Sequence, residues 1–181
     1  MSQAMQDLET LRYPVGRFLL DTEPTPQKRD GWIAAIEALP TRMREAVEDL
    51  DDAQLDTPYR PAGWTLRQVV HHVADSHLNA YVRLKLALTE DAPPIKGYDE
   101  KLWAELPDAR LPVAVSLDLL DALHARWTAL LRSMTDDAFA RRWMHPEHGS
   151  RDLDFLLQLY AWHSRHHVAH VSSLRERTGW V

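Results

Sequence analysis

Apolar residues recur at helical spacing along most of this chain. The clearest case runs from about Asp152 to Thr178, where a helix drawn at about 100° per residue gathers them on one side. These residues are Leu153, Leu156, Leu157, Tyr160, Val171 and Leu174. No segment of the sequence alternates apolar and polar residues as a half-buried strand would. The pattern therefore predicts an all-α protein.

Capping residues mark the ends of two predicted helices. Thr65 and Gln68 have the spacing of a capping box, in which each side chain accepts a hydrogen bond from the other residue's backbone N–H. The helix that they open is predicted to end near Glu90, ahead of two consecutive prolines. Gly179 suits the position just after the last helix, with Trp180 as the apolar contact that follows it.

Two further helices are bounded by prolines and by a serine. One is predicted to open near Thr25, with Pro26 in its first turn. Pro40 should break it before it resumes to about Leu50. The other is predicted to begin with Ser116 as its N-cap.

Four long helices joined by connections of unequal length predict a four-helix bundle. Residues 1–24, punctuated by prolines and a glycine, are predicted to form an irregular N-terminal arm. Residues 91–115 are predicted to form a long loop between the second and third helices, with one short turn near residues 100–103. Loops of this length in compact domains are often functional.

The composition excludes several classes of protein. The sequence has 181 residues, which predicts one domain over 1–181, and its formal net charge is −6. That charge argues against a nucleic-acid partner, because binding to phosphates relies on a basic surface. No apolar run reaches the roughly 20 residues of a membrane span and no secretory pattern opens the sequence, so we expect a cytoplasmic protein. With no cysteine, any metal site must use nitrogen and oxygen ligands.

Four of the ten histidines stand within eight residues of the last predicted helix. His163, His167 and His170 share its apolar stripe, and His166 lies further off. Several imidazoles on one buried face need a common reason, because an unpaired buried polar group costs about 1–3 kcal/mol. A histidine pair at i and i+4 can bind one metal ion, which is our interpretation of this segment. Ser164 stands where the zinc-protease motif has glutamate, which argues against that class of protease.

A third ligand is predicted to come from the second long helix. Periodicity favours His77, which lies with the apolar residues of that helix. His72 lies instead on a more polar side. The residues alone leave both open. His124, on the third helix, also falls in an apolar stripe, where a histidine hydrogen-bonded within the core is the simpler interpretation.

Two segments resemble the YfiT branch of the DinB-like family. They are Gly63–His77 (GWTLRQVVHHVADSH) and Tyr160–His170 (YAWHSRHHVAH). Weaker matches extend the resemblance over nearly the whole chain. The family implies a four-helix bundle, usually a homodimer, with one divalent metal held by three histidines. Carried over by position, the metal ligands are His72, His163 and His167.

The resemblance also implies an enzyme, because the family contains metal-dependent hydrolases and this branch includes bacillithiol S-transferases. A divalent ion on three imidazoles, zinc or alternatively nickel, would activate water or a low-molecular-weight thiol for reaction with a small-molecule substrate. Such a thiol would be a cosubstrate, since the chain has no cysteine. Asp75, His124 and His170 are the candidate catalytic residues, for orienting groups or transferring protons.

Two other functions compete with catalysis. The metal could be structural in a binding or stress-response protein, or the histidines could serve only as packing in a metal-free bundle. A closed site with a fourth protein ligand would favour a structural metal, whereas an open position facing a pocket would favour catalysis.

Overall fold

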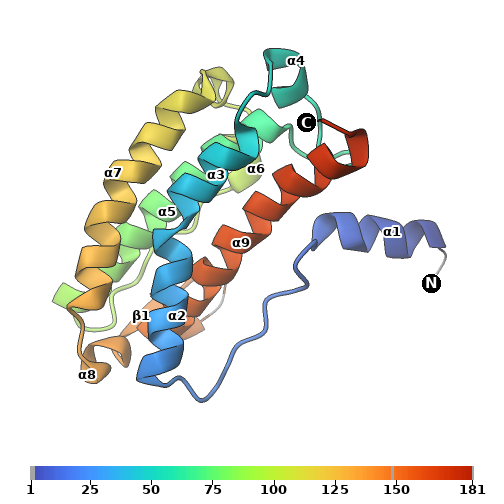
Figure 1. The fold of residues 1–181 in the computed structure, drawn as a ribbon. Helices are drawn as coiled ribbons and strands as arrows, with labels where there is room; N and C mark the ends of the chain where they lie inside the picture. The colour runs from blue at the N-terminus through green and yellow to red at the C-terminus, as the bar shows by residue number, and fades with distance from the viewer. Residues whose placement is uncertain (1–2, 148, 181) are drawn as a thin grey trace.

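Four helical segments pack around a shared core in the computed structural model, which describes residues 3–147 and 149–180 (Figure 1). They are α2 (Pro26–Glu37) continued by α3 (Leu39–Val47), α5 (Leu66–Thr89), α7 (Val113–Arg132) and α9 (Leu153–Thr178). α9 packs against α2, α3 and α5, and α7 packs against the same three helices. This arrangement confirms the predicted four-helix bundle.

Two of the helical segments run in the same direction side by side. Arg29, near the start of α2, binds Asp154 at the start of α9. Arg175, near the end of α9, donates hydrogen bonds to the carbonyls of Ala46 and Glu48 at the end of α3. α9 is therefore parallel to α2 and α3.

The remaining two helices, α5 and α7, run antiparallel to α9. Ser76 of α5 contacts Tyr160 of α9, whereas residues earlier on α5 meet later ones on α9, so these two helices are antiparallel. The carbonyl of Leu111, just before α7, lies 2.9 Å from Nε2 of His71 near the start of α5. The long connection after α5 therefore returns along the bundle, and α7 runs parallel to α5 (Figure 1).

Shorter elements complete the described part of the chain. They are α1 (Gln3–Arg12), α4 (Asp52–Leu55), α6 (Glu100–Trp103), the 3-10 helix η1 (Pro107–Arg110), α8 (Asp136–Phe139), β1 (Arg142–His145) and β2 (Gly149–Asp152). β1 and β2 form an antiparallel hairpin with Arg142 opposite Asp152. None of the described helices is long and apolar enough to cross a membrane.

The predicted helix ends are confirmed where capping chemistry defined them. Thr65 Oγ1 accepts from the N–H of Gln68 at 3.1 Å, and Gln68 Oε1 accepts from the N–H of Thr65 at 3.0 Å. Gly179 ends α9 with φ at 69°, a left-handed conformation that a residue without Cβ adopts freely. The first helix breaks between Glu37 and Leu39, immediately before Pro40, as predicted.

The predicted cap at Ser116 is wrong. α7 begins three residues earlier, at Val113, and Pro112 occupies the cap position. Ser116 is buried, and its Oγ lies 2.7 Å from Nδ1 of His71. The hydroxyl serves a histidine of the neighbouring helix rather than the first turn of its own.

The arm predicted as irregular over residues 1–24 contains a helix. α1 covers Gln3–Arg12 and extends away from the bundle, and residues 1 and 2 lie outside the described residues (Figure 1). The segment after α1 lies along α9. The carbonyl of Gly16 accepts from Nε1 of Trp162, and the backbone of Asp21 exchanges two hydrogen bonds with the side chain of Gln158.

The hairpin of β1 and β2 corrects the expectation of a chain without strands. Its strands have four residues each, too short for an alternating pattern to stand out in the sequence. Trp143 is buried in the hairpin and donates from Nε1 to the carbonyl of Asp152 at 3.2 Å.

The apolar core has two clusters, and the histidines lie between them. On α5 one cluster includes Ala74 and the other begins at Ala80. On α9 the first cluster ends at Ala161 and the second begins at Val171. The bundle therefore places a polar layer of imidazoles between two apolar layers, where an unpaired ring nitrogen would be costly.

The contact between Arg29 and Asp154 fixes the start of α2 on α9. It is bidentate, with both N–O distances 2.7 Å, and the two side chains are 11% and 12% exposed. Arg29 also contacts Asp136, whose side chain is 74% exposed.

We expect Asp154→Ala to lower the free energy of unfolding by about 2 kcal/mol, because the largely buried guanidinium loses two hydrogen bonds to a charged partner. Asp136→Ala, the control, should change it by less than about 0.5 kcal/mol, since an exposed ion pair contributes little. Urea denaturation measures both values. Equal losses in the two variants would contradict the assignment.

Candidate metal centre

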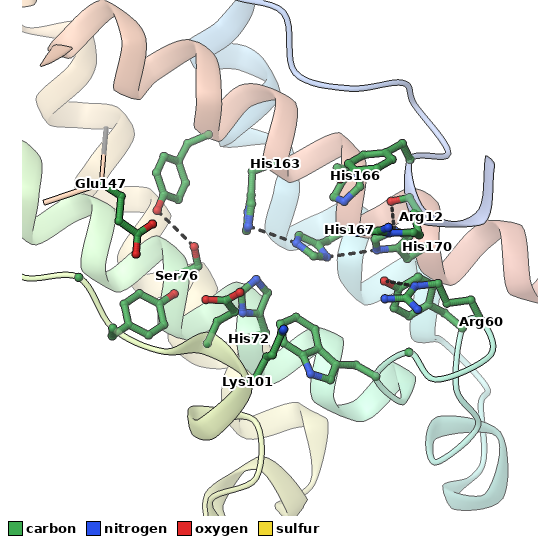
Figure 2. A pocket seen from close by; sticks show the side chains of 18 of the residues that line it. Arg12, Arg60, His72, Ser76, Lys101, Glu147, His163, His166, His167 and His170 are labelled. Atoms are coloured by element: carbon green, nitrogen blue, oxygen red, sulfur yellow. Dashed lines mark hydrogen bonds between the residues drawn. The ribbon is translucent and has the colours of Figure 1, made fainter. Parts of the chain in front are cut away.

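Three histidines from two antiparallel helices converge at the centre of the bundle. His72 comes from α5, and His163 and His167 come from successive turns of α9. One nitrogen of each ring lies within 4.8 Å of the others. Figure 2 shows the three rings pointing toward one another across the gap between the helices. The predicted ligand set is thus brought together.

The two rings on α9 approach each other through their Nε2 atoms, which lie 3.1 Å apart. Spacing by four residues stacks His163 and His167 on one helix face. Two nitrogen ligands at about 2.0–2.1 Å from one zinc ion lie roughly 3 Å apart. The separation is therefore the one that two ligands of a single ion need.

The hydrogen bonds of His170 settle which nitrogen of His167 is free. Nε2 of His170 lies 3.2 Å from the carbonyl oxygen of Arg12, and a carbonyl can only accept. His170 therefore carries its proton on Nε2 and accepts at Nδ1, which lies 3.3 Å from Nδ1 of His167. His167 donates there, and its Nε2 keeps a lone pair directed at His163 (Figure 2).

The three rings have the protonation that metal binding requires. Burial lowers the pKa of His72 to about 4 and holds the pKa values of His163 and His167 well below their usual range. The positive charges that neighbouring histidines would carry act in the same direction. Neutral imidazole is the form that binds a metal, so the residues fit a divalent ion at neutral pH.

A second trio, His166, His167 and His170, also has nitrogens within 4.8 Å of one another. It fits a metal less well, because both nitrogens of His170 are engaged, one with His167 and one with the carbonyl of Arg12. The trio with His72 has no such conflict. We therefore assign the candidate centre to His72, His163 and His167.

A cavity of about 560 Å³ opens beside the three rings. Its lining includes four cationic side chains and two acidic ones, which are Arg12, Arg60, Arg83, Lys101, Glu100 and Glu147. A volume of this size accommodates a small molecule. The three histidines therefore face an open space rather than a closed shell of protein.

The phenols of Tyr98 and Tyr160 are part of the cavity lining. Tyr160 Oη lies 3.2 Å from Oγ of Ser76. Burial raises the pKa of Tyr98 to about 12, and it also raises the pKa of Tyr160. Both hydroxyls therefore stay protonated at neutral pH and can donate hydrogen bonds.

The other histidines and the aspartate predicted to take part in the site lie at different distances from the cavity. His77 lies behind His163, and His124 lies behind His77, both away from the cavity lining. His170 lines the cavity and supports His167. Asp75 is not among the described residues that line the cavity, although burial raises its pKa to about 6. The catalytic roles of Asp75, His124 and His170 stay predictions.

Most of the residues that line the cavity were not predicted from the sequence. Helical spacing does place Ser76, four residues after His72, on the same polar side of that helix, but its part in a cavity was not predicted. Arg12 and Glu147 come from the arm and from the hairpin, whose positions no local pattern reveals.

We expect the metal-free protein to lose stability as the pH falls below about 6.5. His72, His124 and His170 have pKa values near 4 when folded, against 6.5 in the unfolded chain, because burial opposes their charge. The unfolded state then binds more protons, and each group removes up to about 1.4 kcal/mol per pH unit down to its folded pKa. Urea denaturation from pH 8 to pH 5 measures the slope. A flat profile would contradict the burial of neutral rings.

Comparisons with known proteins agree with the fold. A family model described as the DinB superfamily matches residues 35–171. A protein of Bacillus cereus (strain ATCC 14579) with the name "Putative metal-dependent hydrolase" is 54% identical over 173 residues, which cover 96% of this chain and 100% of that protein. A relative from Bacillus mycoides (strain KBAB4) bears the same description with the same identity and coverage.

Solved structures give the same result. YfiT from Bacillus subtilis, described as "a probable metal-dependent hydrolase with an unusual four-helix bundle topology", is 49% identical and superposes with a TM-score of 0.92. The match covers 95% of this chain and 99% of that one. The four-helix bundle protein TT2238, 21% identical with a TM-score of 0.53, shares the fold. The resemblance seen in the sequence is confirmed, and the chain belongs to the DinB superfamily.

Proposed function

We propose that this protein is a metal-dependent hydrolase of small molecules, with one divalent ion held by His72, His163 and His167. The observation that carries the proposal is the pair of Nε2 atoms on α9, 3.1 Å apart beside an open cavity. The relatives are named as metal-dependent hydrolases, which supports the same reaction class.

An open centre favours catalysis over a structural metal. Among the described residues, the group that contains His72 offers three ligands, and all three line the open cavity. Catalytic zinc sites typically keep one such position for water or substrate. Bound there, a divalent ion supplies a Lewis acid and lowers the pKa of a coordinated water to about 7.

The protein's own groups would bind and orient the substrate. The phenols of Tyr98 and Tyr160 and the hydroxyl of Ser76 offer hydrogen bonds to a carbonyl or hydroxyl oxygen. Because cationic residues outnumber acidic ones in the lining, we propose a substrate with a carboxylate or phosphate group. Glu147, on the hairpin side of the cavity, is the acidic group that Figure 2 shows near the Ser76 end, where it could accept a proton.

Thiol transfer is the second candidate function. The sequence contains no cysteine, and a soft thiolate is a good zinc ligand, so a low-molecular-weight thiol could enter as a cosubstrate. We propose zinc as the metal and nickel as the alternative, because imidazole suits both. The homodimer, the cytoplasmic location and the absence of a nucleic-acid partner stay predictions.

We expect the purified protein to bind about one equivalent of zinc or nickel, and His72→Ala, His163→Ala and His167→Ala each to weaken that binding by at least about 100-fold. His71→Ala is the matched control on α5, because its ring bonds Ser116 and the carbonyl of Leu111 instead of facing the cavity. Mass spectrometry measures metal content, and competition with a chelator measures affinity. Full binding by His72→Ala would move the third ligand elsewhere.

We expect chelation to abolish turnover of small esters, amides or lactones, and restoration of one metal ion per chain to recover it. A panel with matched anionic and neutral substrates tests the charge of the lining, and Arg60→Gln should raise KM for the anionic members alone. The same panel with an added thiol separates transfer from hydrolysis. Turnover that survives exhaustive chelation would overturn the proposed mechanism.

A further inference from the structure

We propose that His77 and His124 are positioning residues that hold the proton of His163 on Nδ1 and so keep its Nε2 free for the metal. The three residues form a buried hydrogen-bonded row, His124–His77–His163, that ends on the carbonyl of Ile36. The inference rests on the metal centre of the proposed function, and it assigns roles to two residues that touch no metal.

The row begins at a carbonyl that proline leaves available. Pro40 has no N–H, so the carbonyl of Ile36 four residues earlier loses its usual helical donor. Nδ1 of His124 lies 2.8 Å from that oxygen. Because a carbonyl can only accept, His124 must carry a proton on Nδ1, and its Nε2 is then an acceptor in the neutral ring.

The next two contacts, from His124 to His77 and from His77 to His163, fix the proton position on each following ring. Nδ1 of His77 lies 3.1 Å from Nε2 of His124, so His77 donates there and carries its one proton on Nδ1. Nε2 of His77 is therefore an acceptor, and it lies 3.1 Å from Nδ1 of His163. His163 must then donate from Nδ1, and its Nε2 carries a lone pair.

The buried surroundings of the three rings favour their neutral forms. His77 is fully buried, and the ring of Trp127, also fully buried, lies 5.5 Å from the ring of His77 and 5.6 Å from that of His124. A charge on His77 would be desolvated, and the groups that act on it electrostatically are histidines, which also oppose a positive charge. Asp121 favours a charge on His124, but burial has the larger, opposite effect on its pKa. Both nitrogens of His77 are also occupied, which explains why the most buried histidine of α5 is not a ligand.

Two carbonyl-anchored sets of hydrogen bonds thus prepare the two ligands of α9 in the same way. The carbonyl of Ile36 acts through His124 and His77 on His163, and the carbonyl of Arg12 acts through His170 on His167. Neither Nε2 can donate to the other across their 3.1 Å separation. Two lone pairs face each other there, and a cation between them removes the repulsion.

Nuclear magnetic resonance of the ¹⁵N-labelled, metal-free protein at pH 7.5 reads the proton positions directly. We expect His124, His77 and His163 each to show a protonated Nδ1 and an unprotonated Nε2, with His163→Ala used to assign the signals. A protonated Nε2 on His163 in the wild type would overturn the proposal.

Metal affinity, measured by chelator competition, tests the consequence. We expect His124→Leu to weaken zinc binding about 10- to 100-fold, the usual effect of losing a partner behind a ligand. His124→Gln should stay within about threefold, because its amide can donate to Ile36 and accept from His77. Trp127→Phe is the matched control, since it disturbs the same packing without a hydrogen bond of the row.

Equal weakening in His124→Leu, His124→Gln and Trp127→Phe would mean that packing alone matters and would overturn the positioning role. Unchanged affinity in His124→Leu would overturn it as well. Thermal melting of each metal-free variant shows that the compared proteins are folded. These readouts do not depend on turnover, so an inactive protein that binds metal would sink the proposed hydrolase and leave the row intact.

Discussion

Every imidazole N–H buried in this bundle has to meet an acceptor, and the centre of the structure is arranged around that requirement. Histidine rings fill the layer between the two apolar clusters, where buried polar groups need hydrogen-bond partners. Three hydrogen bonds join these rings to one another, and two backbone carbonyls, those of Ile36 and Arg12, terminate the sets. These two carbonyls determine which nitrogen carries the proton in each hydrogen-bonded ring of the two sets.

This requirement joins features that are distant in the sequence. Pro40 breaks the first helix, and the break makes a carbonyl available to His124. Arg12 belongs to the N-terminal arm, whose backbone accepts from His170 and is held on α9 by Trp162 and Gln158. A helix interruption and a terminal arm that look like local irregularities are therefore parts of the support of one site.

Much of the fold could be predicted because its signals are local. The box formed by Thr65 and Gln68, the break at Pro40 and the glycine after α9 each depend on residues within one helical turn. Ser116 shows where this reasoning fails, since the same side chain can cap a helix or bond a neighbouring ring. Only the position of α5 beside α7 decides between these two uses.

The residues of the candidate site also differ in how far local sequence patterns could predict them. Spacing placed His163, His167 and His170 in one apolar stripe, and the family resemblance selected the pair His163 and His167 at i and i+4. Periodicity favoured His77 over His72 for a physical reason. His72, the proposed ligand, lines the cavity on a polar side of its helix, whereas His77 lies in the core behind it. The apolar stripe therefore pointed to the residue that we propose as a support rather than to the proposed ligand.

The histidines behind the proposed ligands affect how the candidate centre would bind a metal ion. Rings whose tautomers are already set need no rearrangement when a metal arrives, so the binding geometry exists before binding. The facing lone pairs of His163 and His167 are unfavourable in the folded chain by themselves, and the packing of α5 and α7 against α9 keeps the rings in place. Part of the stability of the apolar layers is then spent on holding two acceptors together. A cation or a proton between the two nitrogens would remove this repulsion, and burial lowers the pKa values of both rings, which disfavours the proton.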